Sequence, residues 1–205
     1  MTQSLLRLLF LAFGLAIFLP SGPAQAQSCG VEFEIPCPPP PPEDNKPAAV
    51  GASLNTSYTK SIVKLLKGAT LTCDDSLELR YRIDCLRIYY GMVADKLPNT
   101  GEYLPIKKAM REAEARLEAI VAANVDTEAP VLRPREGHKP MAKRIAPVRA
   151  VKAAAAEKAA AEAEAVIKET ELVILRSGGD PARRTQHYTD IAAAVEDNLV
   201  VLRSA

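Results

Sequence analysis

Tryptophan is absent from this sequence of 205 residues, and aromatic side chains of any kind are scarce. Alanine, in contrast, is abundant. Aromatic and β-branched residues favour strands, whereas alanine is the strongest helix former. The composition therefore predicts an all-α protein rather than a sandwich of sheets.

An excess of charge of either sign is also lacking. The chain has 26 Lys and Arg against 25 Asp and Glu, a formal net charge of +1. Such a balance gives no electrostatic reason for binding nucleic acid or an anionic membrane. We therefore expect no nucleic-acid partner.

Long apolar runs are missing except at the start of the chain. There an uninterrupted run from Leu8 to Leu19 follows Arg7 and ends at Pro20. About 12 residues suit the core of a signal peptide but fall short of the roughly 20 that a bilayer span needs. No transmembrane segment is therefore expected in the mature chain.

Small residues at Ala24 and Ala26 supply the pattern that a signal peptidase reads. We predict that residues 1–26 are a signal peptide cleaved near Ala26, which makes the mature protein periplasmic or secreted. The alternatives are an uncleaved membrane anchor and a lipoprotein modified at Cys29.

The residue patterns of common catalytic sites are missing too. The sequence has no Gly-rich phosphate loop and no GxSxG elbow. A triad or a histidine-ligated metal would have to use His138, in a basic loop, or His187, at a helix start where a surface or half-buried histidine is ordinary. No CxxC pair is present. We therefore predict no catalytic residue, no cofactor and no metal site.

Four cysteines, Cys29, Cys37, Cys73 and Cys85, follow the predicted signal peptide, and in an oxidising compartment they imply disulfides. Loop-closure entropy favours the local pairs Cys29–Cys37 and Cys73–Cys85. Positions twelve apart in one helix are about 18 Å apart, so the second pair requires Asp74–Ser76 to turn the chain back. If a helix already begins near Cys73, the bonds must cross to Cys29 and Cys37.

Residues 27–53 are rich in proline, with five in succession from Pro38 to Pro42. Such a run favours a semi-rigid polyproline II spacer, or a ligand for a proline-binding groove. We predict a disordered tether here, containing Cys29 and Cys37, and a helical domain over residues 54–205.

Helical spacing of apolar residues predicts a first helix from about Asn55 to Lys67, ended by Gly68. Residues 76–97 are ambiguous, because alternation from Leu77 to Cys85 favours a strand. Spacings of three and four continue to Leu97, however, and outlast a typical strand, which favours a helix.

A turn at Pro98–Gly101 separates this helix from a further one that starts at Pro105 and runs to Asn124. Because the turn is short, residues 76–124 are expected to form an antiparallel helical hairpin. Residues 125–147 contain four prolines and many basic residues and predict a solvated linker; the alternative is a basic loop that binds an anionic wall or membrane polymer.

Two helices are expected near the C-terminus, and with the hairpin they would form a small helical bundle. The first, Val148–Arg176, is expected to bury little over its alanine-rich half, Ala153–Ala165. The second opens at Asp180-Pro181 and presents an apolar face up to Leu202.

A family resemblance rests on residues 73–97. Eleven residues separate Cys73 from Cys85; Tyr90, Ala94-Asp95 and Leu97 follow. This segment resembles the cysteine-paired helical repeat of bacterial periplasmic proteins described as lysozyme-inhibitor-like. The resemblance implies a bond between the two cysteines and inhibition of a cell-wall hydrolase as a candidate function, and it transfers no functional residue.

Together these features predict a non-catalytic periplasmic protein that binds or scaffolds within the bacterial cell envelope. Its partner would be an envelope protein or a cell-wall component. The alternatives are an inhibitor of a cell-wall hydrolase and an enzyme whose site one sequence does not reveal.

Overall fold

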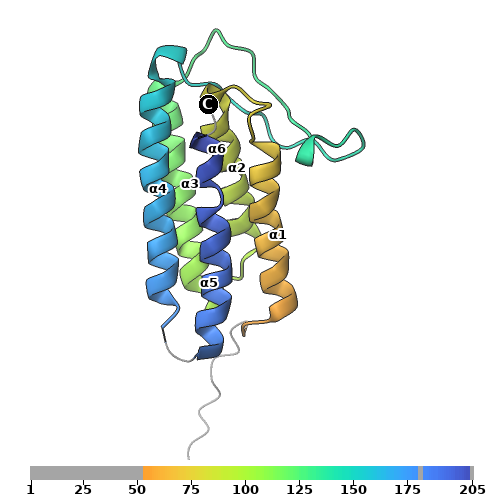
Figure 1. Ribbon diagram of the computed structural model, residues 1–205, viewed down its shortest axis with the longest axis vertical. Helices are drawn as coiled ribbons and strands as arrows, with labels where there is room; N and C mark the ends of the chain where they lie inside the picture. The colour runs from red at the N-terminus through yellow and green to blue at the C-terminus, as the bar shows by residue number, and fades with distance from the viewer. Residues whose placement is uncertain (1–52, 180–181, 204–205) are drawn as a thin grey trace, which may run out of the picture. The chain divides into compact units, whose positions relative to one another are not determined.

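The computed structural model describes residues 53–179 and 182–203. The predicted signal peptide, nearly all of the tether, and Cys29 and Cys37 lie outside these residues. The described chain is mainly helical and has no strand, only isolated β-bridges, which confirms the predicted all-α fold class (Figure 1). Its α-helices are α1 (Thr56–Thr72), α2 (Leu79–Lys96), α3 (Leu104–Asn124), α4 (Ala156–Ser177), α5 (Ala182–Glu196) and α6 (Leu199–Arg203).

Helix α2 is the central element and packs against α1, α3, α4 and α6. Residues on every side of it are buried, as is typical of a helix surrounded by others. The strand alternative for this segment is therefore wrong. A short 3-10 turn, η1 (Gly101–Tyr103), leads into α3, where Pro105 occupies the first turn. The predicted antiparallel hairpin of α2 and α3 is confirmed.

Helix α1 is longer than predicted, because Gly68 does not end it. A Cβ atom placed on Gly68 would lie 3.6 Å from the Tyr89 ring, so the helix passes close to this side chain. The Thr72 hydroxyl donates to the Gly68 carbonyl at 2.8 Å. A glycine inside a helix costs only about 1 kcal/mol, and these contacts offset that cost. The helix therefore continues to Thr72.

Helix α4 differs from the prediction at its start and in its burial. It begins at Ala156, after the short 3-10 turn η3 (Ala153–Ala155), whereas residues 148–152 are extended. Its alanine-rich half is not solvated: four of its alanines are buried, namely Ala156, Ala159, Ala160 and Ala163. Small side chains let α4 pack closely against α3 and α5, which composition alone did not reveal.

The last predicted helix is divided in two at Asp197-Asn198, which gives α5 and the short α6. Asn198 is fully buried, and its side-chain oxygen accepts a hydrogen bond from the Thr70 hydroxyl at 2.9 Å. Arg82, also buried, donates to the Val201 carbonyl at 3.0 Å. Helix α6 is thereby fastened to both α1 and α2.

Candidate functional site: a basic arm and its anchors

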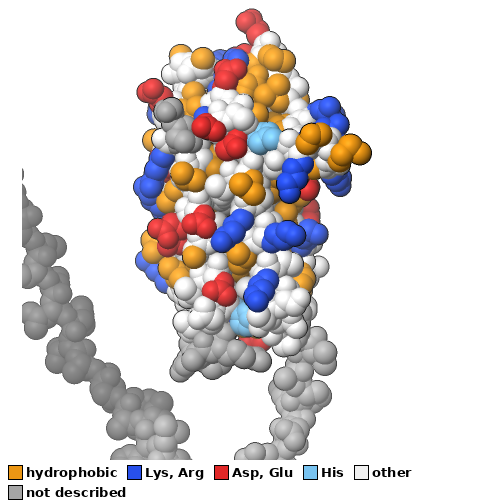
Figure 2. Space-filling model, turned by 45° about the vertical axis from the view of Figure 1, so that its right-hand side comes forward, with side chains coloured by type: hydrophobic (Ala, Val, Ile, Leu, Met, Phe, Trp, Pro, Cys, Tyr) orange, Lys and Arg blue, Asp and Glu red, His pale blue; other side chains and the backbone are white. Residues whose placement is uncertain are grey.

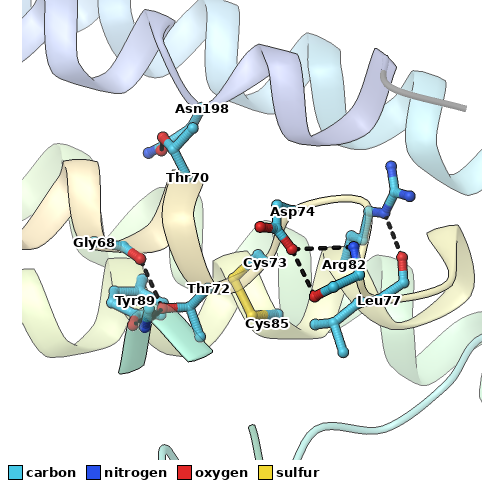
Figure 3. The surroundings of a disulfide bond; sticks show 12 residues. Gly68, Thr70, Thr72, Cys73, Asp74, Leu77, Arg82, Cys85, Tyr89 and Asn198 are labelled. Atoms are coloured by element: carbon cyan, nitrogen blue, oxygen red, sulfur yellow. Dashed lines mark hydrogen bonds between the residues drawn. A yellow bond between two sulfur atoms is a disulfide. The ribbon is translucent and has the colours of Figure 1, made fainter. Parts of the chain in front are cut away.

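The turn between α1 and α2 carries the one disulfide of the described residues. Cys73 ends α1, the chain reverses over Asp74–Ser76, and the Cα atoms of Cys73 and Cys85 come within 5.7 Å (Figure 3). Both cysteines are fully buried. The local pairing predicted for these two cysteines is therefore confirmed, and the chain turns back where that pairing requires it.

The connection between α3 and α4 folds as a long hairpin, residues 125–152, here called the arm. In Figure 1 it crosses to the α1–α2 turn and projects beyond α1. Its limbs are joined by antiparallel bridges, Val125–Val151, Leu132–Val148 and Arg135–Arg144. Hydrogen bonds of 3.0 and 2.8 Å pair Leu132 with Val148 in both directions. The segment is therefore not an unstructured linker, although the predicted exposure to solvent holds, since Ile145 is the one buried residue within 125–147.

The far end of the arm rests on the disulfide-bearing turn. The short 3-10 turn η2 (Glu136–His138) presents the Gly137 amide, which donates to the Thr72 hydroxyl oxygen at 2.8 Å. His138 Nε2 lies 2.9 Å from Ser76 Oγ and 3.1 Å from Asp74 Oδ1. Gly137 and His138 both have positive φ, 56° and 54°, which is unusual for a histidine. This backbone conformation directs the turn toward the α1–α2 turn that it contacts.

Partial burial alone would raise the pKa of Asp74, but other contacts outweigh it. Hydrogen bonds from the Ser76 hydroxyl and amide, together with His138, hold the pKa of this carboxyl below its ordinary value. The ionised carboxylate is therefore the form that supports the end of the arm.

The return limb of the arm is fixed by four charged side chains, Asp84, Arg87, Glu118 and Arg149. The Arg149 guanidinium donates to Asp84 at 2.9 and 3.2 Å and to Glu118 at 2.6 and 3.0 Å, and its amide donates to Asp84 at 2.7 Å. Arg87 Nε bonds Asp84 at 2.5 Å and lies 3.1 Å from Glu118. Two cations and two anions from α2, α3 and the arm thus neutralise one another.

Asp84 is the buried centre of this cluster, with no exposed surface. Desolvation would raise its pKa, but hydrogen bonds from the side chain and amide of Arg149, and from Arg87, lower it below the ordinary value. The same contacts raise the pKa of Arg149. Asp84 and Arg149 are therefore both charged at neutral pH, and their ion pair clamps the arm to α2.

The outer side of the arm is basic and partly apolar. Its exposed cations are Arg133, Lys139, Lys143 and Arg144. Met141 is 95% exposed and Val131 is 57% exposed. Because the inner side buries Ile145, Val148, Ala150 and Val151, the outer side is presented at a defined place instead of sampling many.

A second polar cluster surrounds His187. It lies at the N-terminal end of α1, whereas the disulfide turn follows the C-terminal end of that helix. The Thr59 hydroxyl lies 2.8 Å from His187 Nδ1 and 2.9 Å from the Tyr103 hydroxyl. A hydroxyl beside a histidine is the geometry of an activated nucleophile. Thr59 is 1% exposed and His187 8%, so these two side chains are largely covered, and their contacts join α1, η1 and α5.

The sequence-predicted site residues therefore fall into two groups. Cys73 and Cys85 are brought together, whereas Cys29 and Cys37 lie outside the described residues. Sequence reasoning missed Asp84, although a charged residue between the apolar Ile83 and Cys85 was a usable signal. Within the described part of the chain no group of three or more His, Cys, Asp or Glu could hold a metal ion.

Across residues 53–179 and 182–203, none of the helices has both the length and the apolar character that spanning a membrane requires. Comparison with known protein families, with curated proteins and with solved structures found no match to this chain.

Proposed function

We propose that this protein is a non-catalytic binding or scaffolding protein of the bacterial cell envelope, and that the arm is its binding element. The observation that carries the proposal is the fixed, projecting position of an exposed basic segment. Loops of this length in compact domains are usually functional or disordered, and this one is folded. The contacts of Asp84 and of Thr72 hold its two limbs from opposite ends.

The charge of the arm indicates the chemistry of the partner. Lys139 and Lys143 are exposed, and neither forms an ion pair with the residues that the structure describes. Exposed Met141 lies between them in sequence and adds an apolar contact. An anionic envelope component with some apolar surface, such as an acidic region of a protein, suits this combination.

Quantitative capture from envelope extract tests the proposal. The oxidised protein, a variant with Lys139→Glu and Lys143→Glu, and a control with Lys108→Glu and Lys158→Glu are immobilised side by side. Lys108 and Lys158 are exposed on α3 and α4, so the control makes the same charge change away from the arm. We expect one component to be retained by wild type and control and lost from the arm variant; equal retention by all three would refute the role of the arm.

Inhibition of a cell-wall hydrolase is the second candidate, and the basic end of the arm favours it. Most glycoside hydrolases act through a pair of carboxyl groups beside the scissile bond, and a lysine from a projecting loop could pair with them. If this is the function, the protein should slow lysis of a cell-wall suspension in proportion to its concentration. The arm variant should not, whereas the control variant should. An unchanged lysis rate would remove this candidate.

A further inference from the structure

The outer face of α1 carries a row of lysines. Lys60, Lys64 and Lys67, at spacings of four and three, are exposed on one side of the helix, and Leu71, 62% exposed, continues the row. None of these lysines lies within ion-pair distance of a carboxylate among the residues that the structure describes. We call this row the lysine strip.

The neighbouring face of α5 and of the junction after it has the opposite charge. Asp190 and Asp197 are exposed, and neither pairs with a cation in the described ranges; Val200, 53% exposed, continues this row on α6. We call it the acidic strip. Figure 2 shows this side of the molecule, where blue and red side chains gather side by side with hydrophobic ones among them.

Two hollows separate the strips. One, of about 380 Å³, has the lysines on one wall and Asp190 and Asp197 on the other. The next, of about 680 Å³, is shared by Lys67, Leu71, Asp197 and Val200. Glu196 and Arg203 also line it, and Arg203 is paired with Glu164 of α4. The surface is thus furrowed along the helix direction, with opposite charges facing each other too far apart to form ion pairs.

A surface with two parallel strips of opposite charge is complementary to itself. Rotation by 180° about an axis that runs between the strips, parallel to the helices, puts the lysine strip of one copy opposite the acidic strip of the other. The same rotation brings Leu71 opposite Val200. An axis across the strips would instead oppose like charges, which is unfavourable.

We propose that a second copy of this chain docks on this face, forming a two-fold dimer whose facing helices run parallel. Such isologous contacts are the commonest form of self-association in soluble proteins. The paired strips extend from one side of the Leu71–Val200 contact, and their charges find partners across the interface. This proposal does not rest on the function of the arm.

Sedimentation equilibrium of the oxidised full chain tests the dimer. We expect wild type to show twice the monomer mass, and the dimer to weaken as salt is raised, because exposed charges are screened. Lys60→Glu with Lys67→Glu should give a monomer, and so should Asp190→Lys with Asp197→Lys. The matched control, Lys108→Glu with Lys158→Glu on α3 and α4, should stay dimeric.

The two monomeric variants also provide a restoring experiment. One has two negative strips and the other two positive strips, so an equimolar mixture should form a mixed dimer. A chain with all four substitutions should again pair with itself. These recoveries would not occur if the substitutions acted by unfolding the protein.

Three results would overturn the proposal. One is a wild type that is monomeric at its highest soluble concentration. Another is a dimer that survives both sets of substitutions, because it must then use a different face. A third is a monomer that retains an envelope protein through the lysine strip, which would assign the face to a foreign partner.

Discussion

The helical bundle and the arm are held by different kinds of interaction. In the bundle, apolar faces of successive helices are buried against one another, and even the tyrosines of α2 are covered. The arm buries only four apolar side chains, and its ends are fixed by hydrogen bonds and ion pairs to Thr72, Asp74 and Asp84. Apolar burial is spread over many residues, whereas these polar contacts are few and directional.

Because the interactions differ, we expect the arm to open under conditions in which the bundle stays folded. Loss of one buried apolar side chain weakens the entire bundle, because every helix shares the core. Loss of one polar anchor should release the arm through a local opening while the helices persist.

The largest effect is expected from Asp84→Asn. The substitution leaves Arg87 and Arg149 with a single carboxylate, Glu118, around a buried site. Breaking a buried ion pair by removing one partner costs about 3 kcal/mol or more of unfolding free energy. Chemical denaturation measures the loss, and hydrogen exchange of the Arg149 amide reports whether the arm is released first.

An exposed carboxylate supplies the control for this prediction. Asp95 pairs with Arg111 on the surface between α2 and α3. Asp95→Asn should therefore cost less than about 1 kcal/mol, as exposed ion pairs do. Equal losses for Asp84→Asn and Asp95→Asn would contradict the clamping role of the buried cluster.

The next effect concerns the disulfide, which belongs to both regions. Cys73→Ala with Cys85→Ala should lower the unfolding free energy by about 2–3 kcal/mol, because the bond restricts the unfolded chain. It should also loosen the turn that supports Gly137, so the amide of that residue should exchange faster than amides in α3. Adding a reductant to wild type should reproduce both changes. Unchanged stability would show that the bond contributes nothing.

A smaller effect is expected from Thr72→Val. The Thr72 hydroxyl oxygen accepts from the Gly137 amide and lies 2.7 Å from the Tyr89 hydroxyl. Valine keeps the shape but leaves these buried groups without their partner, at about 1–2 kcal/mol. Tyr89→Phe removes only the bond inside the bundle and is the matched variant. Exchange at Gly137 should quicken in Thr72→Val alone; the same change in both variants would mean that the arm and the bundle open together.

Sequence reasoning succeeded where the folding signal is local. Spacings of three and four along 79–97 and 106–124 predicted α2 and α3, and the short turn between them predicted the hairpin. Loop length favoured the Cys73–Cys85 bond over the crossed pairing, on the condition that the chain turns back at Asp74–Ser76. Each of these inferences depends on residues within about one helix of each other.

It failed where the deciding contacts join distant parts of the chain. The arm folds because Arg149 finds Asp84, 65 residues away, and because the Val151 amide donates to the Arg80 carbonyl. The spacing of apolar residues along the sequence does not predict contacts between residues so far apart in the chain. The alanines of α4 were misjudged for a related reason: their burial depends on how closely α3 and α5 approach, and a small side chain alone does not predict a neighbour.

The smallest effect is the acid sensitivity of the end of the arm, and its sign follows from Asp74. The pKa of this carboxyl is lower in the folded protein than in the unfolded chain. Its contribution to stability is therefore complete above the unfolded value of about 4 and is lost as pH falls through the folded value. Because the side chain is more than one third exposed, solvent screens the effect, and the loss should be confined to the arm.

Exchange of the Gly137 amide against pH measures this loss. Below about pH 4 the amide should exchange faster, relative to amides in α3, than the intrinsic rate at that pH accounts for. In Asp74→Asn the relative rate should already be raised at neutral pH and should change less on acidification, because no carboxylate remains to be protonated. If wild type and Asp74→Asn respond to acid in the same way, the support of the arm does not depend on Asp74. The arm would then be held at this end by Thr72 and the apolar inner side, and the contrast between the two regions would be weaker than the contacts imply.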